Sequence, residues 1–359
     1  MKWTTIALII CLLMACALLP TPPSPTVPLA SSRLATLTPK PSVTPIPPPT
    51  RRVAATTPQP ADTATAPLPT PRPFQKYYID YLRTLHYGAG EVKNKGIFGS
   101  NDFFTRYSIQ YPSETLQIAG FMNVPNGPGP YPVIIVLHGY SNPDEYNTLD
   151  YTTDTADDLA TKGYIVVKPN LRNFIPSDKG DAMFRAGYAI DVLNLIALIR
   201  ENAGKPGLFQ KANPDRIGLW AHSMGGEIAL KVAVISRDIK AIVLYAPMSG
   251  NEKTDSTFFN LTLGGKDLQT EMTASDADFQ ALSPETYYKD ITAAIQIHHG
   301  TGDTVIPVTS SEHTCQKLKD AGVNTTCYYY DGAQHTFKGS YMPEYSSHVD
   351  AFFTLYLKK

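Results

Sequence analysis

Hydrophobic residues recur in two alternating patterns along residues 105–357. Some segments, such as 133–137, are short and continuously apolar, which is typical of strands buried on both faces of a sheet. Others, such as 182–201, place apolar residues every three or four positions, which predicts a helix. These patterns predict strands over 105–111, 116–124, 133–137, 164–168, around 217, 241–245, 294–298 and 325–330, and helices over 153–162, 182–201, 227–235, 310–321 and 347–357.

Strands that alternate with helices predict a mostly parallel central sheet with helices on both faces, an α/β fold. The first two strands are expected to form an antiparallel N-terminal hairpin that turns at 112–113. Residues 249–285 show no clear strand, and an insertion of this size predicts either a lid or a wall of a substrate pocket.

The first 73 residues follow neither pattern. Residues 6–19 are an apolar run of 14 residues, the length of a secretory signal core and too short for a comfortable membrane span. The segment that ends at Cys16 resembles the lipobox of bacterial lipoproteins, in which the cysteine is lipidated, although Met14 is unusual at its position. A plain signal peptide or an uncleaved anchor is the alternative.

Residues 20–73 hold 17 of the 31 prolines and no aromatic residue, which predicts a disordered tether. We therefore expect three parts: a signal peptide or lipoprotein signal (1–19), a Pro/Thr/Ser-rich tether (20–73) and one folded domain (74–359). This organisation predicts an exported protein, extracellular or at the cell surface, that contacts a membrane only through an N-terminal anchor.

Charge and the spacing of histidines and cysteines limit which partners, metals and cross-links the chain is expected to have. Residues 74–359 carry 25 basic and 31 acidic side chains, a formal charge of −6, without basic clusters, so nucleic acid is not expected as a partner. His298 and His299 are adjacent but lack a third ligand at a suitable spacing, so we expect neither a metal site nor a cofactor. In an exported protein, the pair Cys315 and Cys327 predicts a disulfide, with two buried free thiols as the alternative.

The segment around Ser223 predicts a serine nucleophile. An apolar strand ends at Trp220, a helical run begins at Glu227, and the turn between them places Ser223 at its apex with the small residues Ala221 and Gly225 on either side. This is the pattern of a nucleophile elbow. The neighbouring histidine, His222, is expected to pack at the elbow with its side chain turned away from the serine.

A base and an acid follow in the order that such a serine needs. Asp303 comes after the 294–298 strand and His335 after the 325–330 strand, so both lie where parallel sheets build their sites. The strand 133–137 ends in His138-Gly139-Tyr140. The backbone N–H groups of Tyr140 and Met224 are therefore candidates for an oxyanion hole.

These motifs resemble those of the α/β-hydrolase superfamily over residues 105–359, and most closely the prolyl oligopeptidase catalytic domain and dienelactone-hydrolase-like esterases. The most specific match is the segment 299–307 followed by 332–335. The resemblance implies Ser223 as nucleophile, Asp303 as acid and His335 as base. The chain departs from the pattern at Ala221, Gln334 and Tyr140, and only the last of these affects the expected oxyanion donor.

The function expected from the sequence is a secreted or surface-tethered serine hydrolase that cleaves a carboxylic ester through an acyl-enzyme. A serine-type peptidase acting on short peptides is the main alternative, and a non-catalytic surface binding protein is a weaker one. An ester is favoured because residues 20–102 offer nothing that could form the β-propeller of prolyl oligopeptidases, and because an amide has a poorer leaving group.

Overall fold

The computed structural model describes residues 72–359. The predicted signal segment with Cys16 and nearly all of the predicted tether lie outside the described residues. The first described element is a 3-10 helix at Gln75–Tyr77, which α1 (Ile79–Leu82) follows.

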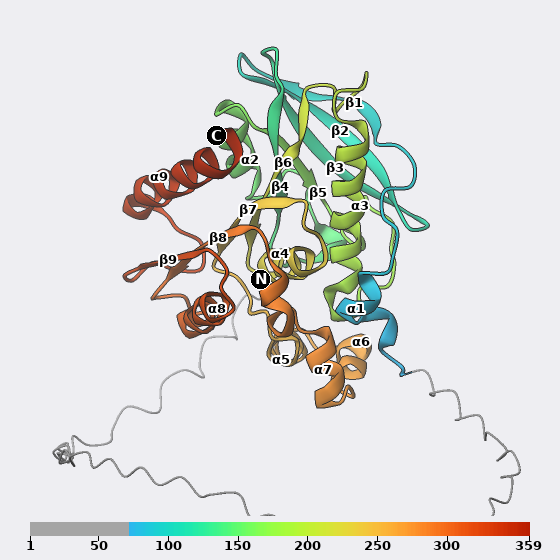
Figure 1. Ribbon diagram of the computed structural model, residues 1–359, viewed down its shortest axis with the longest axis vertical. Coiled ribbons are helices and arrows are strands. Elements are labelled where there is room, and N and C mark those ends of the chain that lie inside the picture. The colour runs from blue at the N-terminus through green and yellow to red at the C-terminus, as the bar shows by residue number, and fades with distance from the viewer. Residues whose placement is uncertain (1–71) are drawn as a thin grey trace, which may run out of the picture. The chain divides into compact units, whose positions relative to one another are not determined.

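A nine-stranded sheet forms the centre of the described domain, in the order β1-β2-β3-β5-β4-β6-β7-β8-β9 (Figure 1). Strands β4 to β9 run parallel to one another, whereas β1, β2 and β3 are antiparallel to their neighbours. The predicted α/β architecture is therefore confirmed. The strands are β1 (Lys93–Ser100), β2 (Phe104–Ser113), β3 (Leu116–Pro125), β4 (Tyr131–Leu137), β5 (Ile165–Pro169), β6 (Ala212–His222), β7 (Ile239–Tyr245), β8 (Ala294–Gly300) and β9 (Thr325–Tyr330).

Two features of the N-terminal strands differ from the prediction. The hairpin between β2 and β3 turns at residues 114–115 rather than 112–113, with Glu114 at φ 54°. Strand β1 has no predicted counterpart, because all eight of its residues are exposed and it therefore lacks an apolar face. Among the strands that the structure describes, β1 forms one border of the sheet and pairs only with β2.

Helices cover both faces of the sheet, as the side chains of β4 show. Ile135 and Leu137 pack in one apolar cluster with residues of α3 (Ala186–Asn202), α4 (Met224–Ile235) and α8 (Val308–Asp320). Ile134 and Val136 point to the other face, where they pack with residues of α2 (Thr153–Thr161) and α9 (Met342–Phe353). Alternate residues of one strand therefore enter two separate cores.

The insertion after β7 folds into three short helices, α5 (Glu252–Thr262), α6 (Lys266–Glu271) and α7 (Asp276–Leu282). A buried ionic cluster, here called the Arg185 cluster, joins it to the rest of the domain. Arg185 contacts Glu227 on α4 at 2.8 Å and Glu271 at the end of α6 at 3.1 Å, and it also contacts Glu252. Lys231 on α4 lies 2.7 Å from Glu252. The insertion is thus fixed to the helix that follows Ser223.

Candidate active site

Ser223 sits between β6 and α4 in a backbone conformation that side chains rarely adopt, with φ 54° and ψ −118°. A methyl group on Gly225 would come within 2.6 Å of the Leu137 carbonyl oxygen, so glycine is required there. The Ser223 amide donates to the Tyr245 carbonyl at 3.0 Å, and its carbonyl accepts from the amides of Gly226 and Met248. The sharp turn is therefore held on both sides, and it presents the hydroxyl at the carboxyl ends of the strands.

His335 and Asp303 are directly bonded. Nδ1 of His335 lies 2.7 Å from Oδ2 of Asp303, although the two residues come from loops after different strands. A carboxylate only accepts, so the Nδ1–H donates and Nε2 is the ring nitrogen available to act on a proton.

The Asp303 side chain is fully buried and has several other donors. Its Oδ1 accepts from the amides of Val305 and Ile306, at 2.8 and 3.0 Å, and Nε2 of His299 lies 3.0 Å from its Oδ2. Burial alone would raise the pKa of Asp303, but hydrogen bonds from His299, His335 and the Ile306 amide together hold it well below its usual value. Asp303 is therefore a carboxylate at neutral pH.

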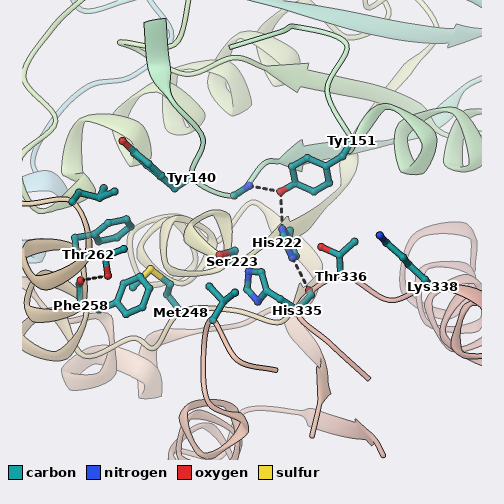
Figure 2. Close-up of a pocket in the computed structure, with 14 residues that line it drawn as sticks. Tyr140, Tyr151, His222, Ser223, Met248, Phe258, Thr262, His335, Thr336 and Lys338 are labelled. Carbon is teal, nitrogen blue, oxygen red and sulfur yellow. Dashed lines mark hydrogen bonds between the residues drawn. The ribbon is translucent and has the colours of Figure 1, made fainter. Parts of the chain in front are cut away.

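Ser223 and His335 line the same cavity, which has a volume of about 500 Å³ (Figure 2). Because His335 is in turn bonded to Asp303, the structure brings the three predicted residues to one place. The other lining residues come from the loop after β4, the end of β6, the segment after β7 with its insertion, and the loops that carry Asp303 and His335: Gly139, Tyr140, Tyr151, His222, Met248, Phe258, Phe259, Thr262, Leu263, Val305, Thr336 and Lys338.

The two predicted oxyanion donors flank the elbow. Tyr140 follows Gly139, and a methyl group on Gly139 would lie 3.0 Å from Cβ of Ser223, so this loop passes close to the serine. Within residues 72–359, no backbone acceptor is found for the amide of Tyr140 or of Met224. The Gly139 amide, in contrast, donates to the Tyr151 hydroxyl at 2.8 Å. The amides of Tyr140 and Met224 therefore remain the candidates for an oxyanion hole.

The side chain of His222 packs at the elbow and also lines the cavity, which was not foreseen. Its Nε2 lies 3.1 Å from the His335 carbonyl oxygen, and its Nδ1 lies 2.6 Å from the Tyr151 hydroxyl (Figure 2). Burial lowers the pKa of His222 to about 3, so the ring is neutral at pH 7. Nε2–H then donates to the carbonyl, and Nδ1 accepts from the tyrosine.

His222 and Tyr151 thus form a bridge from the His335 loop to Gly139, and sequence reasoning missed it. The sequence does carry a signal for the histidine, because β6 extends through His222 and side chains alternate along a strand. Trp220 packs in the α2 and α9 core, and His222 points to the same side of the sheet. For Tyr151, on a loop, the sequence holds no comparable signal.

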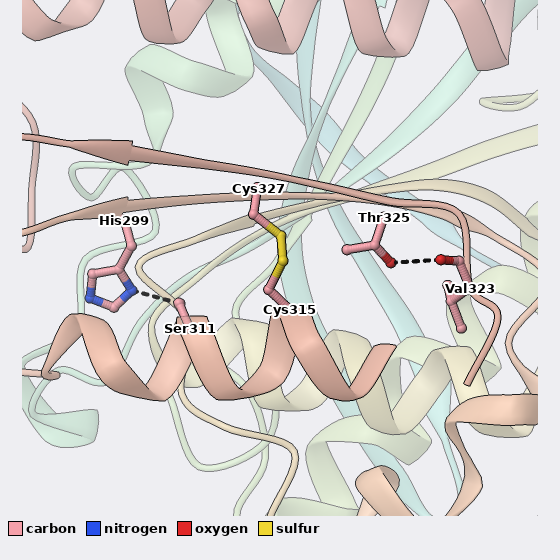
Figure 3. The surroundings of a disulfide bond; sticks show 6 residues. All are labelled: His299, Ser311, Cys315, Val323, Thr325 and Cys327. Carbon is pink, nitrogen blue, oxygen red and sulfur yellow. Dashed lines mark hydrogen bonds between the residues drawn. A yellow bond between two sulfur atoms is a disulfide. The ribbon is translucent and has the colours of Figure 1, made fainter. Parts of the chain in front are cut away.

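Cys315 and Cys327 form a disulfide that joins α8 to β9 (Figure 3). Ser311 lies one turn before Cys315 on the same helix, and its hydroxyl is 2.7 Å from Nδ1 of His299. His299 in turn contacts Asp303. The disulfide therefore fixes a helix that supports the acid.

Within the part of the chain that the structure describes, no three His, Cys, Asp or Glu side chains are arranged to hold a metal ion. His298 is instead bonded to the Tyr330 hydroxyl and to Gln296, both at 2.8 Å. None of the helices among residues 72–359 has the length and apolarity needed to cross a membrane.

Comparison with known sequences gives a family match and several relatives. The sequence model of the dienelactone hydrolase family matches residues 118–351. A Yersinia pestis protein provisionally named a carboxymethylenebutenolidase is 25% identical over 237 residues, which cover 65% of this chain and 79% of that protein.

Two solved structures show the same fold. Acetyl xylan esterase 1 of Thermoanaerobacterium sp. JW/SL YS485 gives a TM-score of 0.56 at 15% identity, covering 79% of this chain and 94% of the esterase. Acylaminoacyl peptidase of Pyrococcus horikoshii gives 0.57 at 21% identity, covering 72% of this chain but only 42% of the peptidase. The predicted membership of the α/β-hydrolase superfamily is confirmed.

Proposed function

We propose that this chain, which belongs to the dienelactone hydrolase family and is a serine hydrolase, cleaves a carboxylic ester through an acyl-enzyme formed on Ser223. The observation that carries the proposal is the 2.7 Å bond between His335 and Asp303 beside a serine in the strained elbow conformation. This is the arrangement of nucleophile, base and orienting acid that acyl transfer needs.

In the first half-reaction, Nε2 of His335 takes the Ser223 proton while Oγ forms a bond to the ester carbonyl carbon. The amides of Tyr140 and Met224 hold the resulting oxyanion; loss of one such donor costs roughly 3–4 kcal/mol in known enzymes. The carbon–oxygen bond to the alcohol then breaks, and the imidazolium returns its proton to the leaving oxygen. Asp303 stays ionised and stabilises the charged ring.

In the second half-reaction, water takes the place of Ser223. His335 removes a proton from the water as it attacks the acyl carbon, and the same two amides hold the second oxyanion. The bond to Oγ breaks, Ser223 regains a proton from the imidazolium, and the carboxylic acid leaves. The alcohol leaves with the proton that came from Ser223, and Ser223 regains a proton that came from water, so the enzyme ends in its starting protonation state.

A fluorophosphonate probe tests the nucleophile, because it labels an activated serine covalently. We expect Ser223 to be labelled, and both labelling and ester hydrolysis to be lost in Ser223→Ala. Ser347→Ala, an exposed serine on α9, is the matched control and should behave like the unchanged protein. Labelling that persists in Ser223→Ala would falsify the proposed nucleophile.

An ester substrate is proposed over a peptide because an amide has the poorer leaving group. Comparison of p-nitrophenyl esters with aminoacyl-nitroanilides at matched concentrations separates the two substrates. We expect kcat/KM for the esters to exceed that for the anilides by at least about 100-fold, or about 2.7 kcal/mol. Equal rates for the two series would assign the chain to the peptidases.

We also propose that the protein is exported and tethered at the cell surface, with Cys16 lipidated. The disulfide between Cys315 and Cys327 supports an oxidising compartment. The apolar run at 6–19 and the proline-rich segment at 20–73 supply the features of a signal and a spacer. Metabolic labelling with a fatty acid should mark the intact chain and not Cys16→Ser. An unlabelled intact chain would indicate a plain signal peptide or an uncleaved anchor instead.

A further inference from the structure

We propose that the apolar side of the Ser223 cavity binds the acyl group of the ester, that this group is a medium-length hydrocarbon, and that the rings of Tyr140 and Phe259 limit its length. The proposal rests on Ser223 acting as the nucleophile. On this proposal the acyl half of the ester is its apolar half, and two named side chains limit its length.

The cavity has two chemically different sides (Figure 2). Met248, Phe258, Phe259 and Leu263 supply an apolar side, to which the insertion contributes all but Met248. Thr336 and Lys338, which follow His335 in the chain, supply a polar and exposed side. In Figure 2, Ser223 and His335 lie between Phe258 on one side and Thr336 and Lys338 on the other.

The position of His335, which must protonate the leaving alcohol, determines how the ester lies in the cavity. The leaving oxygen receives its proton from His335, so the alcohol must lie next to that ring. Thr336 and Lys338 are the neighbours on that side. The acyl substituent, on the other bond of the carbonyl carbon, is then directed to the apolar side. The structure therefore pairs an apolar acid with a polar, solvent-facing alcohol.

The apolar side is held in place before substrate binds. Phe258 and Phe259 lie on α5, and the same helix carries Glu252 and Ser256, whose side chains are buried in contact with Arg185. Glu252 also contacts Lys231 on α4 at 2.7 Å. Because ions buried in this way are costly to separate, α5 cannot leave its position without breaking the Arg185 cluster.

Tyr140 and Phe259 stand between this cavity and a second one. The second cavity has a volume of about 800 Å³ and shares Tyr140, Phe259 and Leu263 with the first. The rings of Tyr140 and Phe259 meet edge to face with centroids 6.0 Å apart. An acyl chain that grows beyond the first cavity meets these two rings, and open space lies behind them.

The test is a series of p-nitrophenyl esters from acetate to dodecanoate, measured as kcat/KM. Each methylene that enters an apolar site is worth up to about fourfold, so hexanoate should exceed acetate by at least about tenfold. Dodecanoate should fall about tenfold below hexanoate, because a chain of that length meets the two rings. In Tyr140→Ala, which keeps the backbone amide, the dodecanoate-to-hexanoate ratio should rise about tenfold.

Tyr140→Phe keeps the ring and should keep the unmodified chain-length profile. Leu261→Ala alters the same helix at a position that is 81% exposed and should also keep it. A preference for acetate, or identical profiles for Tyr140→Ala and Tyr140→Phe, would overturn the acyl assignment. Either result leaves the proposed nucleophile standing as long as Ser223→Ala abolishes hydrolysis of every ester in the series.

Discussion

The Tyr151 hydroxyl lies 2.6 Å from Nδ1 of His222, and this bond connects the loop that carries Gly139 with the loop that carries His335. One of the two oxyanion donors of the proposed mechanism, Tyr140, and the general base come from these two loops. Their relative position therefore depends on a histidine and a tyrosine that touch neither the nucleophile's proton nor the acid.

Removal of this hydroxyl should slow the reaction without unfolding the protein. We expect Tyr151→Phe to lower kcat/KM for p-nitrophenyl hexanoate by about tenfold, because the net value of one hydrogen bond is about 1 kcal/mol and the Gly139 amide loses its acceptor. Tyr81→Phe, at an exposed position on α1, is the control. An unchanged rate in Tyr151→Phe would show that the bridge does not position the oxyanion loop.

Replacement of Asp303 should lower the rate far more than replacement of Tyr151. Asp303→Asn keeps the shape but can donate to Nδ1 of His335, which favours the wrong tautomer of the ring. We expect kcat to fall by about three to four orders of magnitude, with circular dichroism unchanged. Asp331→Asn, an exposed residue in the same loop as His335, should change kcat by less than about threefold. Similar losses in the two variants would argue against a special role for Asp303.

The buried histidines predict loss of stability in acid. Burial lowers the pKa of His222 to about 3 and that of His138 to about 4. The unfolded chain binds protons on these residues below about pH 6.5, while the folded chain stays neutral, so stability falls as the pH drops. Urea unfolding should show each ring contributing up to about 1.4 kcal/mol per pH unit between pH 6 and 4.

Variants can assign this slope to individual residues. In His222→Asn the pH dependence should be shallower than in the unmodified protein, whatever the variant's absolute stability. His86→Gln changes an exposed histidine and should leave the slope as it was. A slope that is the same in all three proteins would mean that other groups cause the acid sensitivity.

The Arg185 cluster predicts that loss of a buried cation destabilises the fold much more than loss of an exposed one. Arg185→Met leaves three buried carboxylates without this partner and should destabilise the fold by about 3–5 kcal/mol. Lys253→Met breaks an exposed pair with Asp276 on the same insertion and should cost less than about 1 kcal/mol. Thermal or urea unfolding measures both, and comparable losses would contradict the anchoring role of the cluster.

The disulfide should contribute substantially to stability. It closes a loop between residues 12 apart, and a loop of that size is worth about 3 kcal/mol in the chain-entropy model. Cys315→Ser combined with Cys327→Ser should lower the free energy of unfolding by that amount. Reductant should destabilise the unmodified protein to a similar extent and leave the double variant unaffected.

The sequence was most informative where one local rule decides the structure. The continuous apolar run of β4 and the small residues beside Ser223 each have one physical interpretation, and the sheet and the elbow follow them. The order of Ser223, Asp303 and His335 along the chain then placed them after three parallel strands, β6, β8 and β9, at one edge of the sheet. Strand β1 escaped prediction because exposed residues on both faces leave no periodicity to detect.

Contacts between distant segments were the hardest to foresee. Tyr151 meets His222 across 71 positions, and Arg185 meets Glu271 across 86. Neither pair has a local spacing that could reveal it, since the fold alone brings them together. The role of His299 was missed for a related reason: adjacent histidines drew attention to metal ligation, whereas one of them supports Asp303.

Strand β9 lies at the border of the sheet with β8 as its single neighbouring strand, yet the segment that follows it delivers His335. Outermost strands are the first to fray when a protein is warmed or diluted into mild denaturant. The disulfide between α8 and β9 anchors this edge strand to a helix. Its reduction should therefore abolish ester hydrolysis under conditions in which the central strands remain folded. Activity should therefore be lost by local unfolding at the edge of the sheet, before the whole domain unfolds.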